Sequence, residues 1–286
     1  MNFYKSTAQG AAPSCLYVMN SNEKIITNED FEFFRNLIYS RAGINITPNK
    51  MDLLRNRLGR RLQALELNSF SEYRNFLKNS DNKEEIINLI NCVSTNKTDF
   101  FREEKHFEFM TETLKNENFR RDELYIWSCP CSSGEEPYSI AIALNELYGS
   151  LNKFDIKILA TDISTKMLEK GEHGIYNDET IKNIPGHLLK KYFHQRENGY
   201  EIKKEIRRTV YFRYLNLMEQ IPFDKKFDFI FCRNVLIYFD NKTQRQILLK
   251  IMRHLKDSGY LFTGHSESLN KLDLPLKYIQ AAVYKL

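Results

Sequence analysis

The chain has 286 residues, more than one average domain of about 150 residues, so we expect two domains. Hydrophobic residues make up 42% of it and charged residues 28%, which excludes a disordered chain, and the mild formal net charge of +5 leaves any preference for an acidic partner to local clusters of charge. No apolar run reaches the roughly 18 residues of a membrane span and the start lacks a signal-peptide pattern, so we expect a cytoplasmic protein without membrane insertion.

The N-terminal third of the chain has the spacing of a small helical domain. Residues 1–26 lack sustained periodicity and are predicted to form a mobile tail. Thr27 and Asp30 then resemble a capping box, and Gly43 is placed to end the helix that they begin. A second helix and two shorter helical patterns follow. We therefore predict an all-helical domain over residues 27–93.

In the remainder, residues 94–286, short apolar runs alternate with helical patterns. The predicted strands are residues 124–128, 156–160, 227–232, 259–263 and 279–284. Strands that alternate with helices predict an α/β fold with a mostly parallel sheet covered by helices on both faces. Residues 200–204 and 209–214 flank charged residues and indicate a small β-hairpin insertion over about 193–214.

The five cysteines are odd in number and unevenly spaced, which argues against a disulfide framework. Cys129 and Cys131 form the only close pair. A zinc site would need a second short spacing of cysteines or histidines, and the six histidines supply none. We therefore expect no metal site.

The segment from Trp127 to Ser139 lies where a predicted strand ends and a helix begins, which is where open α/β sheets bind ligands. Its only glycine is Gly134 and it has no lysine, so it fits neither the dinucleotide fingerprint nor a phosphate-binding loop. Glu135 and Glu136 at the helix start would repel a phosphate and suit a cationic ligand, or one with hydroxyl and amine donors. The alternative is that both carboxylates only stabilise the helix dipole.

Asp162 lies just past the second predicted strand, 28 residues beyond Gly134. An acid in this position accepts hydrogen bonds from the two hydroxyls of a ribose, which predicts a nucleoside ligand. The alternative is an N-cap for the next helix, a role that aspartate fills equally well. Spacing and strand context together favour the ligand.

Six motifs follow one another along the chain: Asn96-Lys-Thr-Asp-Phe-Phe-Arg102, Ser132-Ser-Gly-Glu-Glu-Pro-Tyr-Ser139, Ala160-Thr-Asp-Ile163, Leu215-Asn-Leu217, Phe231-Cys-Arg-Asn-Val-Leu-Ile-Tyr-Phe239 and Leu261-Phe-Thr-Gly-His-Ser-Glu267. In this order, behind a helical domain, they resemble the chemotaxis receptor methyltransferases of the CheR family, over about residues 27–286. The resemblance implies a class I methyltransferase domain of Rossmann-like fold, with S-adenosylmethionine as methyl donor. It also implies that glutamates of methyl-accepting chemotaxis proteins are the acceptors, giving glutamate methyl esters and S-adenosylhomocysteine in the adaptation of chemotaxis signalling.

The resemblance further implies roles for individual residues. Arg102 and Tyr238 would be the pair that faces the substrate. Cofactor contacts would come from Asn96, Thr98, Arg102, Glu136, Asp162, Asn216, Leu217, Asn234 and Val235. The residues alone favour structural roles instead, a salt bridge at the domain junction for Arg102 and a half-buried aromatic at a strand end for Tyr238.

A carboxylate acceptor agrees with the chemistry of these residues. A glutamate with a pKa near 4.3 is about 99.8% ionised at pH 7, so the nucleophile needs no general base. Arg102 would fork onto its oxygens while Tyr238 donates one hydrogen bond. The chain also lacks an Asn-Pro-Pro-Tyr or Asp-Pro-Pro-Tyr element, which is associated with transfer to amino nitrogens. For His265, a structural hydrogen bond that closes a turn is favoured over a role as catalytic base.

Basic side chains gather on one side of the second predicted helix. Lys50, Arg57 and Arg61 lie beside its apolar stripe, with Arg60 nearby. Such a run is usually a solvated face, and nucleic-acid binding is another reading. In the CheR family it resembles the surface of the N-terminal domain that docks acidic receptor helices, so we expect these four residues to contact the cytoplasmic helical bundle of a chemoreceptor.

The chain departs from the family pattern in two places. Pro130 and Cys131 stand in the cofactor loop where relatives often have small residues, so we expect a different local turn and a shifted cofactor affinity. The hairpin near Glu197 to Tyr200 looks short, so we expect no tether to a receptor C-terminal pentapeptide.

Two other functions stay open, a cofactor-bound sensor and a nucleic-acid methyltransferase, although the missing Pro-Pro-Tyr element disfavours the second. We expect a monomer.

Overall fold

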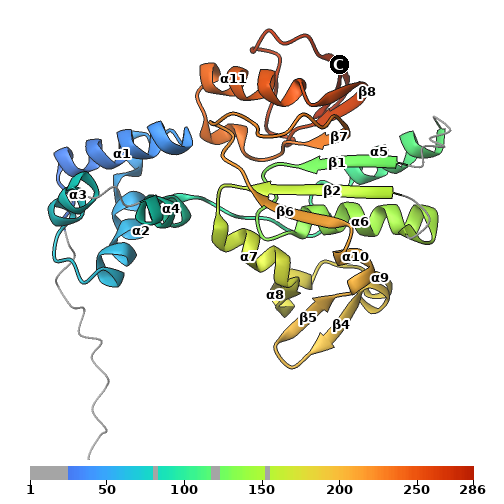
Figure 1. Ribbon diagram of the computed structural model, residues 1–286, viewed down its shortest axis with the longest axis horizontal. Helices are drawn as coiled ribbons and strands as arrows, with labels where there is room; N and C mark the ends of the chain where they lie inside the picture. Colours follow the sequence, from blue (N-terminus) through green and yellow to red (C-terminus); the bar gives the residue numbers. More distant parts are fainter. Residues whose placement is uncertain (1–24, 80–82, 117–122, 152–154) are drawn as a thin grey trace, which may run out of the picture.

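The computed structural model describes residues 25–79, 83–116, 123–151 and 155–286 (Figure 1). The predicted mobile tail, residues 1–26, lies almost entirely outside the described residues. Among the described residues, no helix combines the length and the apolarity that a membrane span needs. A helical unit lies on one side of Figure 1 and a larger α/β unit on the other.

The helical unit consists of α1 (Asn28–Ala42), α2 (Met51–Ala64), α3 (Phe70–Asn79) and α4 (Lys83–Val93), with a 3₁₀ turn, η1 (Pro48–Lys50), before α2. The hydroxyl of Thr27 accepts a 3.1 Å hydrogen bond from the backbone N–H of Asp30 and caps α1. Gly43 ends the helix in the left-handed conformation, with φ of 71°. The apolar faces of the four helices meet in one core around Phe34 and Leu58. Both predicted ends of the first helix are therefore confirmed.

The larger unit is built on a seven-stranded sheet of order β6-β2-β1-β7-β8-β10-β9. Its strands are β1 (Glu123–Ser128), β2 (Asp155–Asp162), β6 (Val210–Tyr214), β7 (Phe227–Phe231), β8 (Leu255–Phe262), β9 (Lys277–Gln280) and β10 (Val283–Lys285). Strands β6, β2, β1, β7 and β8 pair in parallel, while β10 pairs antiparallel with β8 and β9. The predicted mostly parallel sheet is confirmed.

Helices cover both faces of this sheet, as the strand pattern predicts. Leu124 and Ile126 of β1 point to the face covered by α5 (Lys105–Asn116), α6 (Glu135–Tyr148) and α7 (Thr165–His173). Tyr125 and Trp127 of the same strand point to the opposite face, covered by α11 (Asn241–Met252). Alternate side chains of one strand therefore belong to two separate cores, which explains why its sequence is apolar from Leu124 to Trp127.

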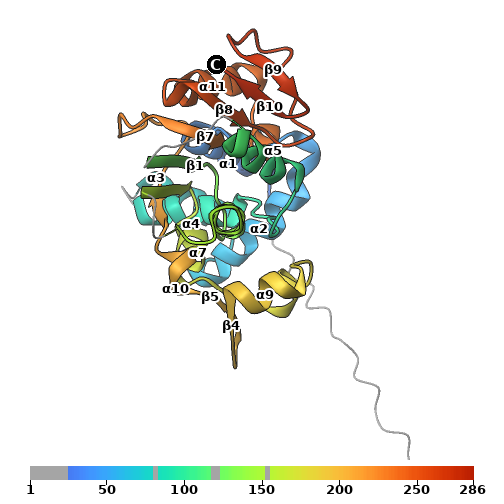
Figure 2. The ribbon, with the colours of Figure 1, turned by 90° about the vertical axis from the view of Figure 1, so that its right-hand side faces the viewer.

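The insertion differs in extent from its predicted range of 193–214. Its antiparallel sheet consists of β3 (Ile175–Tyr176), β5 (Gly199–Ile202) and β4 (Phe193–Arg196), and it projects from the main sheet in Figure 2. The short helices α8 (Asp178–Ile181), α9 (Gly186–Tyr192) and α10 (Lys204–Arg207) flank it. The predicted pairing of residues 209–214 within the hairpin is wrong, because β6 pairs in parallel with β2 at the edge of the main sheet. Val210 and Phe212 are buried there in the main core.

One further predicted strand is divided. Residues 279–284 form the end of β9 and most of β10, because Ala282 adopts a positive φ of 60° and turns the chain between them. The two strands then pair with each other and close one edge of the sheet.

The helical unit is fastened to the carboxyl edge of the sheet by hydrogen bonds. The backbone N–H of Asn45 donates to the carbonyl of Tyr238 at 2.8 Å, and the Tyr39 hydroxyl donates to Asp240 at 2.7 Å. The arrowheads of β1 and β2 point toward the helical unit in Figure 1. Ligands of open α/β sheets bind at this edge, so the helical unit stands beside the expected site.

Candidate functional site

A cleft opens where the carboxyl ends of β1, β2 and β7 meet the helical unit. It is open to solvent, and both polar and apolar side chains line it. Ala42 and Val93 of the helical unit form part of its wall. Every residue that the sequence assigns to catalysis or cofactor binding lines it, namely Asn96, Thr98, Arg102, Glu136, Asp162, Asn216, Leu217, Asn234, Val235 and Tyr238.

Asp162 ends β2 with its carboxylate buried in the wall of the cleft. Its Oδ2 accepts from the N–H of Ser132 and its Oδ1 from the N–H of Ser164, both at 2.8 Å. Burial raises the pKa of Asp162 to about 6, although these backbone donors favour the carboxylate. The backbone N–H of Ile163 also donates to this carboxylate, so one of its roughly four acceptor sites is left for a ligand. The N-cap of α7 is Ser164 and not Asp162, so the alternative capping role falls away.

The two glutamates at the start of α6 have different roles. The carboxylate of Glu135 accepts from the Ser133 hydroxyl at 2.8 and 2.9 Å and does not line the cleft, and burial raises its pKa to about 6. Glu136 lines the cleft and accepts a 2.7 Å hydrogen bond from the Ser128 hydroxyl. Of the two roles considered for this pair, Glu135 therefore fits the structural one, and Glu136 fits the one that faces a ligand.

Arg233, which follows β7, is the buried cation that organises this end of the cleft. It is 3% exposed, and its guanidinium lies 2.8 Å from Glu136 and 3.0 Å from Glu103. Burial would raise the pKa of Glu103, but Arg233 beside it holds that pKa below its usual value. Burial raises the pKa of Glu136 in spite of Arg233. Sequence reasoning missed Arg233 and Glu103 as site residues, although Arg233 lies inside one motif that it identified and Glu103 follows another directly.

The loop after β7 is held by a second buried carboxylate. Oε2 of Glu267 accepts from the backbone N–H of Asn234 and from that of Gly264, each at 2.7 Å. Asn234 takes a left-handed φ of 57° and turns the chain toward the cleft. A Cβ on Gly264 would lie 2.4 Å from Nδ2 of Asn234, so any larger residue here would displace the Asn234 side chain. The loop therefore presents Asn234 and Val235 as one edge of the cleft.

Asn216 joins the cleft to the helical unit. Its side-chain amide donates to the carbonyl of Arg41 at 2.7 Å and to Glu219 at 3.2 Å, while its Oδ1 accepts from the N–H of Met218 at 3.0 Å. Both amide protons are thus engaged within the protein. A cofactor contact from this side chain would use the remaining acceptor site of Oδ1.

Arg102 and Tyr238 are half-buried side chains that line the cleft with donors to offer. Arg102 donates one 2.9 Å hydrogen bond to the carbonyl of Lys97, and it makes no ion pair within the described residues. The Tyr238 hydroxyl likewise makes no hydrogen bond to any residue that the structure describes. The salt-bridge reading of Arg102 thus has no partner here, and both groups are available to an anion.

The basic side of α2 is smaller than its sequence suggests. Arg61 pairs with the buried carboxylate of Glu85, which also accepts from the Tyr73 hydroxyl at 2.6 Å. Arg57 donates to the carbonyl of Val93 and to the Thr95 hydroxyl. The buried carboxylate of Glu85 needs a paired cation, which Arg61 supplies. The carbonyl of Val93 at the end of α4 needs a hydrogen-bond donor, which Arg57 supplies. Arg57 and Arg61 are therefore engaged within the protein, a correction to the expected free surface, and Lys50 and Arg60 are the exposed members.

Two family models match this chain. The CheR methyltransferase SAM binding domain matches residues 96–285, and the CheR methyltransferase all-alpha domain matches residues 29–94. The chemotaxis protein methyltransferase of Borreliella burgdorferi is 43% identical over 270 residues, covering 91% of this chain and 95% of that protein. That of Escherichia coli K12 is 39% identical over 266 residues, covering 91% and 92%. The chain belongs to the CheR methyltransferase family and is a chemotaxis methyltransferase that uses S-adenosylmethionine.

The cleft fits this cofactor on its own geometry. Asp162 keeps an open acceptor site at the position where a ribose diol is expected. The Glu136 carboxylate suits the positive ammonium of the methionine part, and the partly buried Leu217 and Val235 offer apolar surface to a base. The Pro130 and Cys131 departure leaves the loop able to bring the N–H of Ser132 to Asp162.

Cofactor affinity should fall as the pH drops through about 6. The pKa of Asp162 in the free protein is raised to about 6, and the ionised carboxylate is the stronger hydrogen-bond acceptor for a ribose hydroxyl. Because binding favours the ionised form, each pH unit below this pKa should cost up to about tenfold in affinity for S-adenosylhomocysteine. Calorimetric titrations at pH 7.5, 6.0 and 5.0 measure this. Asp162→Asn should bind weakly and lose the dependence, whereas the distant Asp155→Asn should keep both; an unaltered profile in Asp162→Asn would contradict the assignment.

Proposed function

We propose that this methyltransferase transfers a methyl group from S-adenosylmethionine to glutamate side-chain carboxylates of methyl-accepting chemotaxis proteins, in the cytoplasm. The products are glutamate methyl esters and S-adenosylhomocysteine. The observation that carries the proposal is the pair of available donors, Arg102 and Tyr238, on the wall of the cofactor cleft. The names of the relatives, chemotaxis protein methyltransferases, support a receptor as the acceptor.

The bound cofactor supplies an electrophilic methyl group on a sulfonium sulfur. The acceptor carboxylate is already ionised at neutral pH, so the protein needs to orient it and not to deprotonate it. Arg102 forks onto the carboxylate oxygens and Tyr238 donates one hydrogen bond, which together direct a lone pair at the methyl group. The partly buried Leu217 and Val235 limit water at the reacting atoms, which assists a step that neutralises opposite charges.

The donors at the cleft also discriminate against a nitrogen acceptor. An amino group that loses a proton on attack is favoured by hydrogen-bond acceptors around it. Arg102 and Tyr238 offer donors instead, while Glu103 is paired with Arg233 and the Glu136 carboxylate is taken by Arg233 and by the ammonium group of the cofactor. These observations favour an oxygen acceptor over the amino groups of nucleic acids. A cofactor-bound sensor, the other alternative, would bind S-adenosylmethionine without transferring its methyl group.

We propose that the exposed Lys50 and Arg60 guide the acidic helices of the receptor's cytoplasmic bundle toward the cleft. Lys50 lies at the start of α2, and Arg60 lies on the exposed side of this helix. Two other helices of the same unit, α1 and α4, form part of the cleft wall. Charge pairs of this kind raise the association rate and set the register of two partners. The hairpin turn between β4 and β5 has two residues, which supports a docking mode without the C-terminal pentapeptide tether.

Methyl transfer to a chemoreceptor cytoplasmic fragment should give a label that alkali releases as methanol, because the product is an ester. Tyr238→Phe should lower kcat by about 10- to 100-fold, since one hydrogen bond to a charged group is lost in the transition state. Its affinity for S-adenosylhomocysteine should stay within about twofold. Tyr211→Phe, an exposed tyrosine of β6, is the matched control and should keep full activity. An alkali-stable label would contradict the proposed acceptor, and a wild-type rate for Tyr238→Phe its proposed role.

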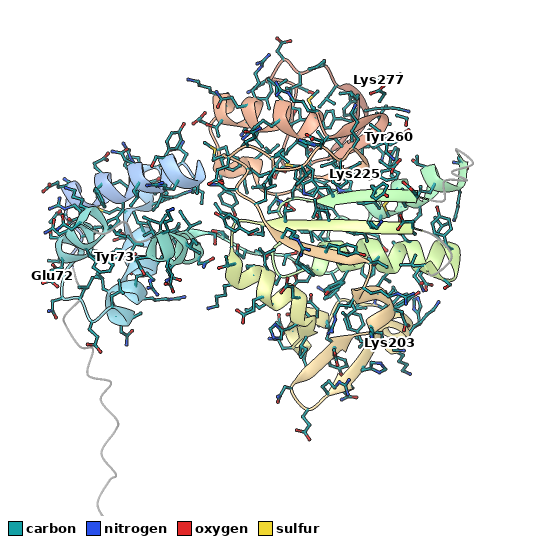
Figure 3. The ribbon with its side chains drawn as sticks, viewed as in Figure 1. Glu72, Tyr73, Lys203, Lys225, Tyr260 and Lys277 are labelled. Atoms are coloured by element: carbon teal, nitrogen blue, oxygen red, sulfur yellow. The ribbon has the colours of Figure 1, made fainter. Side chains whose placement is uncertain are left out.

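Reversing the two exposed charges should weaken receptor recognition and spare the cofactor. Lys50→Glu with Arg60→Glu should raise KM for the receptor fragment by about tenfold at low salt, and by less at high salt because screening removes the effect. Lys277→Glu changes an exposed lysine on the far side of the α/β unit (Figure 3) and serves as the control. An unchanged KM in the double variant would show that these residues do not dock the receptor.

A further inference from the structure

We propose that Glu103, His106 and His265 form a binding site for one divalent transition-metal ion of the zinc type. One ligand atom from each residue lies within 4.8 Å of the others. Two imidazoles and one carboxylate are a donor set that proteins use for zinc and neighbouring metals. The spacing along the sequence predicts no metal site, because the third ligand comes from a loop after β8, far from the first two.

His106 is the strongest reason to expect an occupant. Its side chain is 1% exposed, yet neither Nδ1 nor Nε2 has a hydrogen-bond partner. Buried polar atoms in folded proteins are nearly always paired with protein, water or an ion. A neutral imidazole has the free lone pair that a metal ligand requires.

The three side chains come from two segments that are far apart in the sequence. Glu103 precedes α5, His106 lies in its first turn, and His265 follows β8. His106 Nδ1 is 3.6 Å from Oε2 of Glu103, and the two imidazole rings are 5.0 Å apart between centroids. Ligand atoms around tetrahedral zinc are about 3.4 Å apart, so the site must contract on binding. His265 can supply this movement, because its side chain is exposed and makes no hydrogen bond within the described residues.

The charges around the cluster permit a cation. Arg233 lies 3.0 Å from Glu103, but its guanidinium is also paired with Glu136 at 2.8 Å, so two carboxylates face one positive charge. Oε1 of Glu103 receives only a long 3.3 Å contact from Asn234. A metal ion would share Glu103 with Arg233, so its binding should be felt in the cofactor cleft. The inference is independent of the methyl acceptor.

Zinc titration of the reduced, metal-free full chain tests the site directly. Calorimetry should show one Zn²⁺ bound with a Kd in the micromolar range or below. His265→Ala should weaken this binding by at least tenfold and leave the melting temperature of the metal-free protein unchanged, since the side chain is exposed. His173→Ala, an exposed histidine at the end of α7, is the matched control and should bind zinc as the wild type does. His106→Leu should also abolish binding if it folds.

Cobalt separates this site from the cysteines. Co²⁺ bound to imidazole and carboxylate gives visible d–d bands without the near-ultraviolet charge-transfer band of a cobalt thiolate. That spectrum, lost in His265→Ala, would support the proposal. A thiolate band, or equal zinc affinity in wild type and His265→Ala, would place the metal elsewhere and overturn it. No zinc binding at about 100 μM would overturn it too, leaving a water molecule as the partner of His106.

Discussion

Arg233 is buried at the end of β7, and its guanidinium bridges Glu136 at the start of α6 and Glu103 before α5. A buried guanidinium requires partners that match its charge, because the desolvation of an unpaired ion costs several kcal/mol. The bridge therefore fixes three segments that are far apart in the sequence. It also holds Glu136, which lines the cofactor cleft, and it donates to the carbonyl of Arg102, the residue proposed to face the acceptor.

The cleft depends equally on the junction between the two units. Ala42 and Val93 belong to the helical unit and yet line the cofactor site. Asn216 and the backbone of Tyr238 hold the end of α1 against the sheet edge through hydrogen bonds. The helical unit is thus part of the active-site wall as well as the surface proposed to meet the receptor. A receptor that binds to the helical unit would therefore lie close to the reacting groups in the cleft.

Local rules predict much of this structure from the sequence. Thr27 and Gly43 are where the first helix is capped because side-chain and backbone geometry decide those positions locally. The acid after the second strand, Asp162, lies in the cleft because the carboxyl ends of neighbouring parallel strands meet at one edge. The other residues that the resemblance to the CheR family assigns to the cofactor line the cleft too.

What the sequence does not reveal depends on contacts between distant segments. Residues 209–214 have the pattern of a strand, but the pattern does not indicate which sheet the strand joins. In the structure these residues pair with β2 of the main sheet. The charges of Arg57 and Arg61 suggest a free surface, while Val93 and Glu85 engage them in the fold. The cluster of Glu103, His106 and His265 has no spacing signal at all.

The most direct test of the buried bridge is to titrate S-adenosylhomocysteine into Arg233→Met and into Arg245→Met, a control variant whose arginine is exposed. We expect about a hundredfold loss of affinity in the first and none in the second. Wild-type affinity in a folded Arg233→Met would contradict the central role of the buried bridge.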